Sequence, residues 1–307
     1  MTNSNKASSF YVAAGLIITA IFLFDVVGVI IKLLSARYPA EQLSMFRNVI
    51  GLAPTLLILL FSKPWIESGR KLITPKWKLA LFRGALVATA QFCYYLAISK
   101  MAFATAASIA FSGPLFVTAL SIPFLGEKVG GWRWMAVVLG FTGVLLVIRP
   151  GTEGFSWYLL LPLCASACYA TVSITSKLFD DDVPTALINL YSNSGAIVGA
   201  TLLVLLTGGY VPVANLTDWM WLIAMGFSGG LAVFCLVSAY RRAEPSSLSP
   251  FEYFGIPFSF LLGWVFFTEA PFEQLFPGVL LIVAGGLMIV WRENALKNKQ
   301  KTGPSDG

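Results

Sequence analysis

Apolar residues fill this chain in ten long runs, and shorter polar stretches with proline and glycine separate them. The runs are continuously apolar and come close to the about 20 residues that a helix needs to cross about 30 Å of hydrocarbon. Transmembrane β-strands alternate every second residue instead, so the pattern predicts helices and argues against a barrel. The expected spans are residues 9–34, 41–61, 77–99, 103–124, 131–149, 155–178, 184–206, 216–240, 246–267 and 273–291.

The first half of this pattern recurs in the second half. A shift of 145 or 142 residues superposes the polar landmarks, namely Lys32 on Lys177, Pro39 on Pro184, Asn48 on Asn193 and Glu127 on Glu269. Each copy holds five helices, an odd number, so the second copy must cross the membrane in the opposite direction. The predicted fold class is an all-α integral membrane protein with ten transmembrane helices as two inverted five-helix repeats. The expected domains are residues 9–150, residues 155–292 and a basic cytoplasmic tail, 293–307.

Composition and charge give the same class and an orientation. Hydrophobic residues make up 57% of the chain and charged residues only 12%, against about 25% charged in soluble proteins. Of the 21 Lys and Arg residues, 15 fall on one predicted side and four on the other. Cytoplasmic loops collect these residues, so both termini are expected in the cytoplasm and the protein in the inner membrane. The net charge of +6 then follows from topology, and no nucleic-acid partner is expected beside the lipid bilayer. The first apolar run is too long for a signal peptide, so its helix is expected to be retained.

The chain lacks the residues that several kinds of chemistry require. The chain has no histidine and no Gly-rich phosphate-binding loop, so ATP-driven pumping and histidine proton relays are not expected. The four cysteines all fall inside predicted spans, where they suit packing. No metal, no cofactor and no enzymatic activity are therefore predicted.

Two ionisable residues stand out in the first span. Asp25 and Lys32 lie seven residues apart, on roughly one helix face and two turns from each other. A charge at membrane depth costs about 2.5 to 3.5 kcal/mol and tends to mark function. They are too distant for a direct pair, so each needs a partner on another helix or in a water-filled cavity. The alternative is a static ion pair that ties helices together.

The ninth predicted span contains the strongest single candidate, Glu252, between Phe251 and Tyr253. It could bind a cationic group or carry a coupling proton, or simply cap backbone groups that a proline frees. Pro257 follows it, and Pro114 occupies a similar place in the fourth span. Proline kinks a helix, and paired interruptions in inverted halves point to a binding site; a packing kink is the alternative.

Other polar and aromatic side chains in the spans could stack on and hydrogen-bond a flat ligand, although each one could equally be packing. The candidate substrate contacts are Asp25, Gln91, Tyr94, Tyr95, Ser108, Ser112, Tyr169, Ser173 and Glu252. The candidate charges at the cavity or its gates are Lys32, Arg47 and Lys177.

These residues also carry a family resemblance. Lys32 at the end of the first span, Pro39 and Arg47 around the start of the second, Glu127, and the ending GFTGVLLVIRP resemble the EamA-type carriers of the drug/metabolite transporter superfamily. The resemblance implies a central cavity that opens alternately to either side, and secondary transport. The stretch SAYRRAEPSSLSPFEYFG is similar to the branch with S-adenosylmethionine and riboflavin carriers.

The implied function is a secondary transporter of a small organic metabolite, with a flat heteroaromatic compound such as riboflavin or S-adenosylmethionine favoured. Export of amino acids or related amphiphilic metabolites is the alternative, and a channel or membrane-embedded enzyme is a distant one. A proton or sodium ion is the candidate coupling ion. The sequence leaves the oligomeric state and the direction of transport open.

Overall fold

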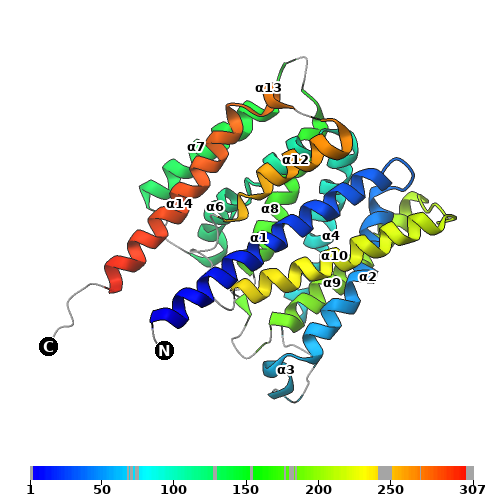
Figure 1. The fold of residues 1–307 in the computed structure, drawn as a ribbon, viewed down its shortest axis with the longest axis horizontal. Helices are drawn as coiled ribbons and strands as arrows, with labels where there is room; N and C mark the ends of the chain where they lie inside the picture. The colour runs from blue at the N-terminus through cyan, green and yellow to red at the C-terminus, as the bar shows by residue number, and fades with distance from the viewer. Residues whose placement is uncertain are drawn as a thin grey trace.

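A computed structural model describes residues 3–301 except 68, 70–71, 73–75, 127–129, 153–154, 176–177, 180–182, 184, 241–250 and 270. Every regular element among the described residues is a helix (Figure 1). The first half contains α1 (Asn3–Leu34), α2 (Ala40–Leu60), α3 (Lys63–Glu67), α4 (Trp77–Lys100), α5 (Phe103–Ala110), α6 (Gly113–Leu125) and α7 (Gly131–Ile148). The second half contains η1 (Trp157–Leu159), α8 (Leu160–Thr175), α9 (Thr185–Thr207), α10 (Leu216–Tyr240), α12 (Gly255–Phe267), α13 (Phe272–Leu275) and α14 (Gly278–Lys301).

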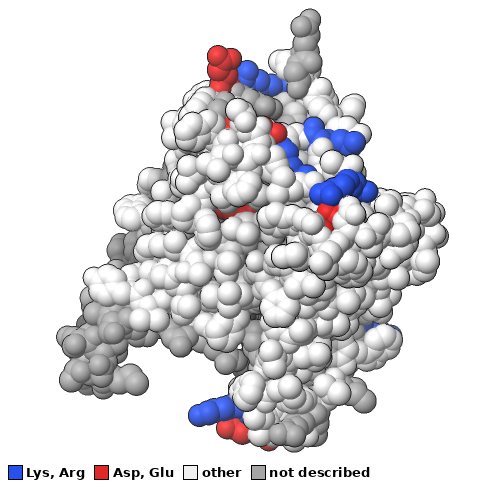
Figure 2. All heavy atoms as spheres, turned by 45° about the vertical axis from the view of Figure 1, so that its right-hand side comes forward, with Lys and Arg blue, Asp and Glu red and all other residues white. Residues whose placement is uncertain are grey.

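Length and hydropathy make this an integral membrane protein. Among the described residues, six helical segments are long and apolar enough to cross a bilayer, namely Phe10–Leu34, Trp77–Lys100, Phe103–Phe124, Trp157–Thr175, Leu187–Thr207 and Leu216–Leu236. Three more apolar helical segments are shorter, at Trp134–Ile148, Gly255–Phe267 and Gly278–Met288. On the face that Figure 2 shows, charged side chains lie mostly toward the two ends, and uncharged atoms cover a broad band between them.

Several helices match their predicted ranges closely. The span predicted at 41–61 is α2 (Ala40–Leu60), and the span predicted at 216–240 is α10. Helix α14 runs on to Lys301, well past the predicted end at residue 291. Its extension, with the sequence RENALKNKQK, contains several good helix formers and no proline or glycine.

The helices are interrupted near both Pro114 and Pro257, as the paired prolines predicted, although each interruption is a break before the proline and not a kink at it. The fourth span is broken before its proline, because α5 ends at Ala110 and α6 begins at Gly113. In the ninth span, α12 likewise begins at Gly255, two residues before Pro257. Both prolines therefore lie in the first turn of a new helix, where a missing N–H costs no helical hydrogen bond.

Helices from the two halves pack against each other in pairs. Helix α14 packs along α7, α9 packs on α2 and α4, and α10 packs on α1 and α2. Figure 1 shows α1 running diagonally beside α10, with the α7 and α14 pair at the edge. Helix α8 packs on α4, α5 and α6.

Close backbone contact between α4 and α9 depends on glycine. A Cβ on Gly84 would lie 2.6 Å from Cα of Gly195, closer than real side chains approach. Between α10 and α2, a Cβ on Gly226 would run into the Ile50 side chain and lie 3.4 Å from the Gly51 nitrogen. Small residues are the usual means by which membrane helices reach such short separations.

The largest buried cluster lies where α1 and α4 end and α2 and α5 begin. Its fully buried members include Ile31, Leu34, Leu43, Ile98 and Phe103. One end of the bundle is therefore tightly packed around the last turns of α1.

Candidate functional site

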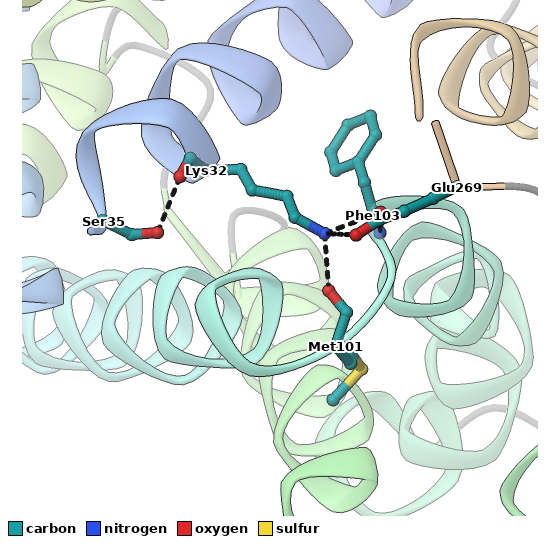
Figure 3. A network of polar contacts seen from close by, with 5 residues as sticks. All are labelled: Lys32, Ser35, Met101, Phe103 and Glu269. Atoms are coloured by element: carbon teal, nitrogen blue, oxygen red, sulfur yellow. Dashed lines mark hydrogen bonds and ion pairs between the residues drawn. The ribbon is translucent and has the colours of Figure 1, made fainter. Parts of the chain in front are cut away.

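Lys32 forms an ion pair inside this packed end of the bundle (Figure 3). Its Nζ donates to Oε1 and Oε2 of Glu269, at 2.5 and 2.6 Å, and to the carbonyl oxygen of Met101 at 2.8 Å. The ammonium also lies 4.9 Å from the centroid of the Phe267 ring, close enough for a cation–π interaction. All three donor positions of the ammonium thus have protein partners.

Glu269 is held equally firmly. Its Oε2 accepts a further hydrogen bond of 2.9 Å from the backbone nitrogen of Phe103. Glycine makes room for this arrangement, because a Cβ on Gly28, one turn before Lys32, would lie 2.5 Å from the Phe103 ring. The network therefore ties together the end of α1, the connection between α4 and α5, and the chain just after α12.

A second buried network joins α2 to α4. The Gln91 side-chain oxygen accepts from Ser44 Oγ at 2.7 Å and from Asn48 Nδ2 at 2.5 Å, and Gln91 Nε2 donates to Asn48 Oδ1 at 3.2 Å. The same Asn48 oxygen accepts from Arg47 Nη1 at 2.9 Å. Gln91 also lies beside the hydroxyl of Tyr169 from α8. This network holds Arg47 close to the junction of α2, α4 and α8.

Three tyrosines connect this junction to α1. Tyr94 of α4 interacts electrostatically with Asp25, Tyr95 and Tyr169. Tyr169 in turn interacts with Tyr95 and with the guanidinium of Arg47. The structure therefore brings together six sequence-predicted candidates, namely Asp25, Arg47, Gln91, Tyr94, Tyr95 and Tyr169, and we call them the tyrosine cluster.

Asp25 is the anomaly within the tyrosine cluster. Its side chain is only 7% exposed, and its Oδ2 has no hydrogen-bond partner in the described part of the chain. Buried polar atoms in proteins are nearly always hydrogen-bonded, and an unpaired buried carboxylate is expensive. An orphaned oxygen at this depth marks Asp25 as a functional candidate.

One face of α8 next to the cluster is open. Tyr169 is 43% exposed, and Ser173, four residues further along the same face, is exposed as well. Ser166, one turn before, packs instead and donates a 2.9 Å hydrogen bond to the carbonyl of Ala110. The helix therefore changes from a packed to an open face along its length, and the cluster can present stacking faces and hydrogen-bonding groups to a ligand.

The remaining candidates lie elsewhere. Ser108 of α5 and Ser112 of the α5–α6 break are fully buried, and their hydroxyl oxygens have no hydrogen-bond partner among the described residues. Glu252 lies just before α12, is half-buried, and interacts electrostatically with Tyr253. Lys177 lies outside the described residues.

Glu269 and Asn48 were not among the sequence candidates. Both already carried a signal, because each belongs to a pair of landmarks that the internal repeat superposes, Glu127 with Glu269 and Asn48 with Asn193. A polar residue that recurs at the same place in both copies of an apolar repeat is a signal of the same kind as Lys32 and Lys177.

Two segments of the chain, residues 12–149 and 156–291, each match the EamA-like transporter family. The chain belongs to the EamA-like transporter family. The resemblance to EamA-type carriers of the drug/metabolite transporter superfamily is therefore confirmed, and the protein is a multi-pass membrane transporter.

The relatives of this EamA family member are named for different cargoes. The pseudopaline exporter CntI of Pseudomonas aeruginosa is 30% identical over 93% of this chain and 96% of its own. An S-adenosylmethionine uptake transporter of Rickettsia bellii is 26% identical, covering 88% of this chain and 90% of its own. A riboflavin transporter of Brucella anthropi is 27% identical, covering 83% and 89%.

The fold also has a solved counterpart. A crystal structure of a protein 22% identical to this EamA family member superposes with a TM-score of 0.61 and covers 95% of this chain and 98% of its own. At that identity the likeness concerns the fold.

Proposed function

We propose that the protein is a secondary carrier that moves a small organic metabolite across the cytoplasmic membrane by alternating access. The observation that carries the proposal is the tyrosine cluster, in which a buried unpaired carboxylate, a guanidinium and three aromatic hydroxyls meet between four helices. Polar groups at membrane depth in a transporter are the expected contacts of its cargo. Both termini are proposed to be cytoplasmic, with a proton or sodium ion as the coupling ion to be tested.

The packing of the helices supports two inverted five-helix repeats. Under the repeat, α1 corresponds to α8, and α10 corresponds to α4. The packed pair α1 and α10 then has its counterpart in α8 and α4, and the pair α4 and α9 has its counterpart in α10 and α2. The pairs α7 with α14 and α2 with α9 are their own counterparts. A pseudo-two-fold axis would generate this set of contacts.

The helix interruptions support the same repeat. The break between α5 and α6 falls at Phe111 and Ser112, and the chain before α12 turns at Tyr253 and Phe254. These positions differ by 142 residues, the shift that superposes the later helices of the two halves. Interrupted helices in corresponding places of two halves are the feature from which a binding site is located in such carriers.

The Lys32–Glu269 network is proposed to close one end of the carrier. It joins the end of α1 to the α4–α5 connection and to the chain after α12, and so it spans both halves. A carrier must close its two ends in turn, and an ion pair between halves can form in one state and separate in the other. On the predicted topology this end faces away from the cytoplasm.

For the cargo, a flat heteroaromatic metabolite such as riboflavin or S-adenosylmethionine is favoured. The tyrosine cluster supplies aromatic faces for stacking and hydroxyls for hydrogen bonds, and relatives carry those two compounds. Amino acids and related amphiphilic metabolites are the second candidate, because the tyrosine cluster contains charges of both signs.

The test is counterflow in proteoliposomes that are preloaded with one unlabelled compound and placed in its labelled form. A carrier gives saturable, transient accumulation, whereas a channel gives neither saturation nor acceleration by preloaded cargo. Tyr169→Ala should abolish the accumulation that wild type shows. Tyr158→Ala is the matched control, since Tyr158 is also exposed but lies at η1 before the cluster. Non-saturable flux through folded wild-type protein would contradict the carrier.

A further inference from the structure

The starting point is that Asp25 is unpaired. No ion pair or hydrogen bond to its carboxylate exists among the described residues, and the side chain is more than nine-tenths buried. Within the tyrosine cluster, its carboxylate interacts electrostatically with the uncharged hydroxyl of Tyr94. A carboxylate in such a place gains most from an external cation that also finds aromatic faces around it.

Arg47 is the opposite charge to Asp25, and it also lacks an oppositely charged partner among the described residues. Its Nη1 donates to the side-chain oxygen of Asn48, an uncharged partner, at 2.9 Å. The ion pairs among the described residues are Lys32 with Glu269 and Arg37 with Asp218, so Arg47 takes part in none of them. Its guanidinium also faces α10, where a Cβ on Gly229 would lie 3.0 Å from Nε. Five N–H donors in a planar fork suit a carboxylate, and most of them remain available for one.

A chain of neighbouring tyrosines connects the two charges, and no ion pair joins them. Asp25 interacts with Tyr94, Tyr94 interacts with Tyr169, and Tyr169 interacts with Arg47. Two opposite charges at the two ends of this chain of tyrosines match a molecule that carries both an ammonium and a carboxylate group. A ligand with a single charge would give an oppositely charged partner to only one of the two, and the other would stay without one.

We infer that the tyrosine cluster is a two-point site for a zwitterionic metabolite, a proposal that rests on the carrier function above. The Asp25 carboxylate binds the ammonium group of the ligand, and the Arg47 guanidinium binds its carboxylate. Tyr94 and Tyr169 stack on or hydrogen-bond the part of the ligand between or beside its charges. A neutral heteroaromatic compound such as riboflavin uses only the tyrosines and is a poor ligand. Among flat compounds, those with an amino-acid group are therefore selected.

The experiment is counterflow with five probes, namely L-tryptophan, S-adenosylmethionine, tryptamine, indole-3-propionate and riboflavin. The first two carry both charges, tryptamine lacks the carboxylate, and indole-3-propionate lacks the ammonium group. At least one zwitterion should be carried by wild type, and tryptamine and indole-3-propionate should compete with it about 30-fold more weakly than L-tryptophan does, as expected when a buried charge loses its partner.

Two variants connect each protein charge to one ligand charge. Asp25→Asn should weaken the zwitterion by about 30-fold and leave competition by indole-3-propionate unchanged, because that probe has no ammonium group to lose. Arg47→Gln should weaken the zwitterion similarly and leave tryptamine unchanged, and Arg47→Lys should recover part of the loss. Changes in helix packing alone would weaken all probes together.

The control removes a buried carboxylate outside the cluster. Glu41 is 8% exposed and accepts a 2.9 Å hydrogen bond from Thr207 Oγ1, which Glu41→Gln preserves. This variant should behave as wild type. Transport of riboflavin or tryptamine in preference to both zwitterions, or unchanged zwitterion affinity in Asp25→Asn and Arg47→Gln, would overturn the inference and leave the carrier standing. Counterflow of none of the five probes by folded protein counts against the carrier function itself, and this site falls with it.

Discussion

Lys32 and Asp25 lie two turns apart on α1, yet their surroundings differ completely. The Lys32 ammonium has three hydrogen-bonding contacts to two partners and an aromatic ring beside it. The Asp25 carboxylate has no partner for Oδ2 among the described residues. Both are mostly buried, so burial alone does not separate them. What separates them is whether the protein itself satisfies the charge.

This difference in hydrogen-bond partners suits the two residues to different roles. A satisfied network stabilises the one arrangement of helices in which its partners meet, and this suits a closed end. An unsatisfied charge gains free energy when something enters from outside, and this suits a binding site. Under the proposed function, α1 connects a closed end of the carrier to a ligand contact nearer the middle of the helix, and the two can be coupled through the helix as a rigid body.

The largest effect is expected from breaking the Lys32–Glu269 ion pair. Lys32→Met leaves Glu269 with a single hydrogen bond, from Phe103, and an uncompensated charge. Losing one partner of a buried pair costs 3 to 5 kcal/mol, and partial exposure of the pair reduces the expected loss to about 3 kcal/mol. The free energy of unfolding in detergent measures this loss, and counterflow should fall below detection.

A double variant separates the closing role from a static one. Lys32→Met with Glu269→Met removes both charges and should recover most of the unfolding free energy, since no charge is left unpaired. Transport should stay low, because the attraction that closes this end is gone. Wild-type counterflow in the double variant would show that the pair only holds the fold together.

The next largest effect is expected in the hydrogen-bond network of Ser44, Asn48 and Gln91, which is compared with the Lys32–Glu269 network. Gln91→Ala removes the shared partner of Ser44 and Asn48, which keep only a 3.5 Å contact with each other and the hydrogen bond from Arg47 to Asn48. The expected loss is about 2 kcal/mol of unfolding free energy. Thr89→Ala is the control, because Thr89 lies on the same helix, is exposed and bonds only to its own helix backbone. Equal stability of the two variants would contradict the importance of the network.

Much of the fold could be predicted from hydrophobic periodicity. The bounds of α2 and α10 were predicted within a residue or so, because a run of apolar residues between polar ends has few alternatives in a bilayer. An interruption near Pro114 was predicted, but its form as two separate helices, α5 and α6, was not. A stretch of small residues and proline is compatible with a kink as well as with two helices. Local sequence sets where a helix can stop, and contacts with other helices decide whether it does.

The sequence predicted several residues that lie together in the structure, but not which side chains pair, and their contact with a cargo stays a prediction. Six candidates do meet in the tyrosine cluster, because polar groups in membrane helices face the bundle interior. The partner of Lys32 lies 237 residues away in sequence. The periodicity of a helix carries no information about contacts between residues so far apart in sequence. The one sequence signal for Glu269 was that the internal repeat superposes it on Glu127.

The Asp25 side of the comparison predicts a gain in stability where function is lost. Asp25→Asn replaces an unpaired buried carboxylate by an uncharged amide of nearly the same size. Removing the desolvation cost should raise the unfolding free energy by about 1.5 kcal/mol, measured without ligand. Ser44→Ala should instead lower it, since Ser44 Oγ is hydrogen-bonded to Gln91. Destabilisation by Asp25→Asn would mean that the carboxylate has a structural partner after all.

The smallest effect concerns a third buried charge, Asp218, which has two partners. Its Oδ2 accepts a 2.7 Å hydrogen bond from Tyr38, and its Oδ1 lies 2.6 Å from Arg37 Nη1. Tyr38→Phe removes one partner and keeps the ion pair, so the expected cost is only about 1 kcal/mol. The variant measures how much stability is lost when a buried charge keeps one of its two partners. Asp218 in Tyr38→Phe is thus intermediate between Lys32, which has all its partners, and Asp25, whose Oδ2 has none among the described residues.

The same contact predicts a dependence on pH. The hydrogen bond to Asp218, with burial and the carboxylate charge, raises the pKa of Tyr38 above the ordinary tyrosine value. At pH values between the ordinary tyrosine pKa and the raised pKa of folded Tyr38, the folded protein keeps a proton that the unfolded chain releases. The stabilisation by Tyr38 is therefore fully present below this window and is lost as pH rises through it. The unfolding free energy of wild type should therefore approach that of Tyr38→Phe at alkaline pH. A difference between the two proteins that stays constant with pH would show that the hydroxyl does not hold its proton through Asp218.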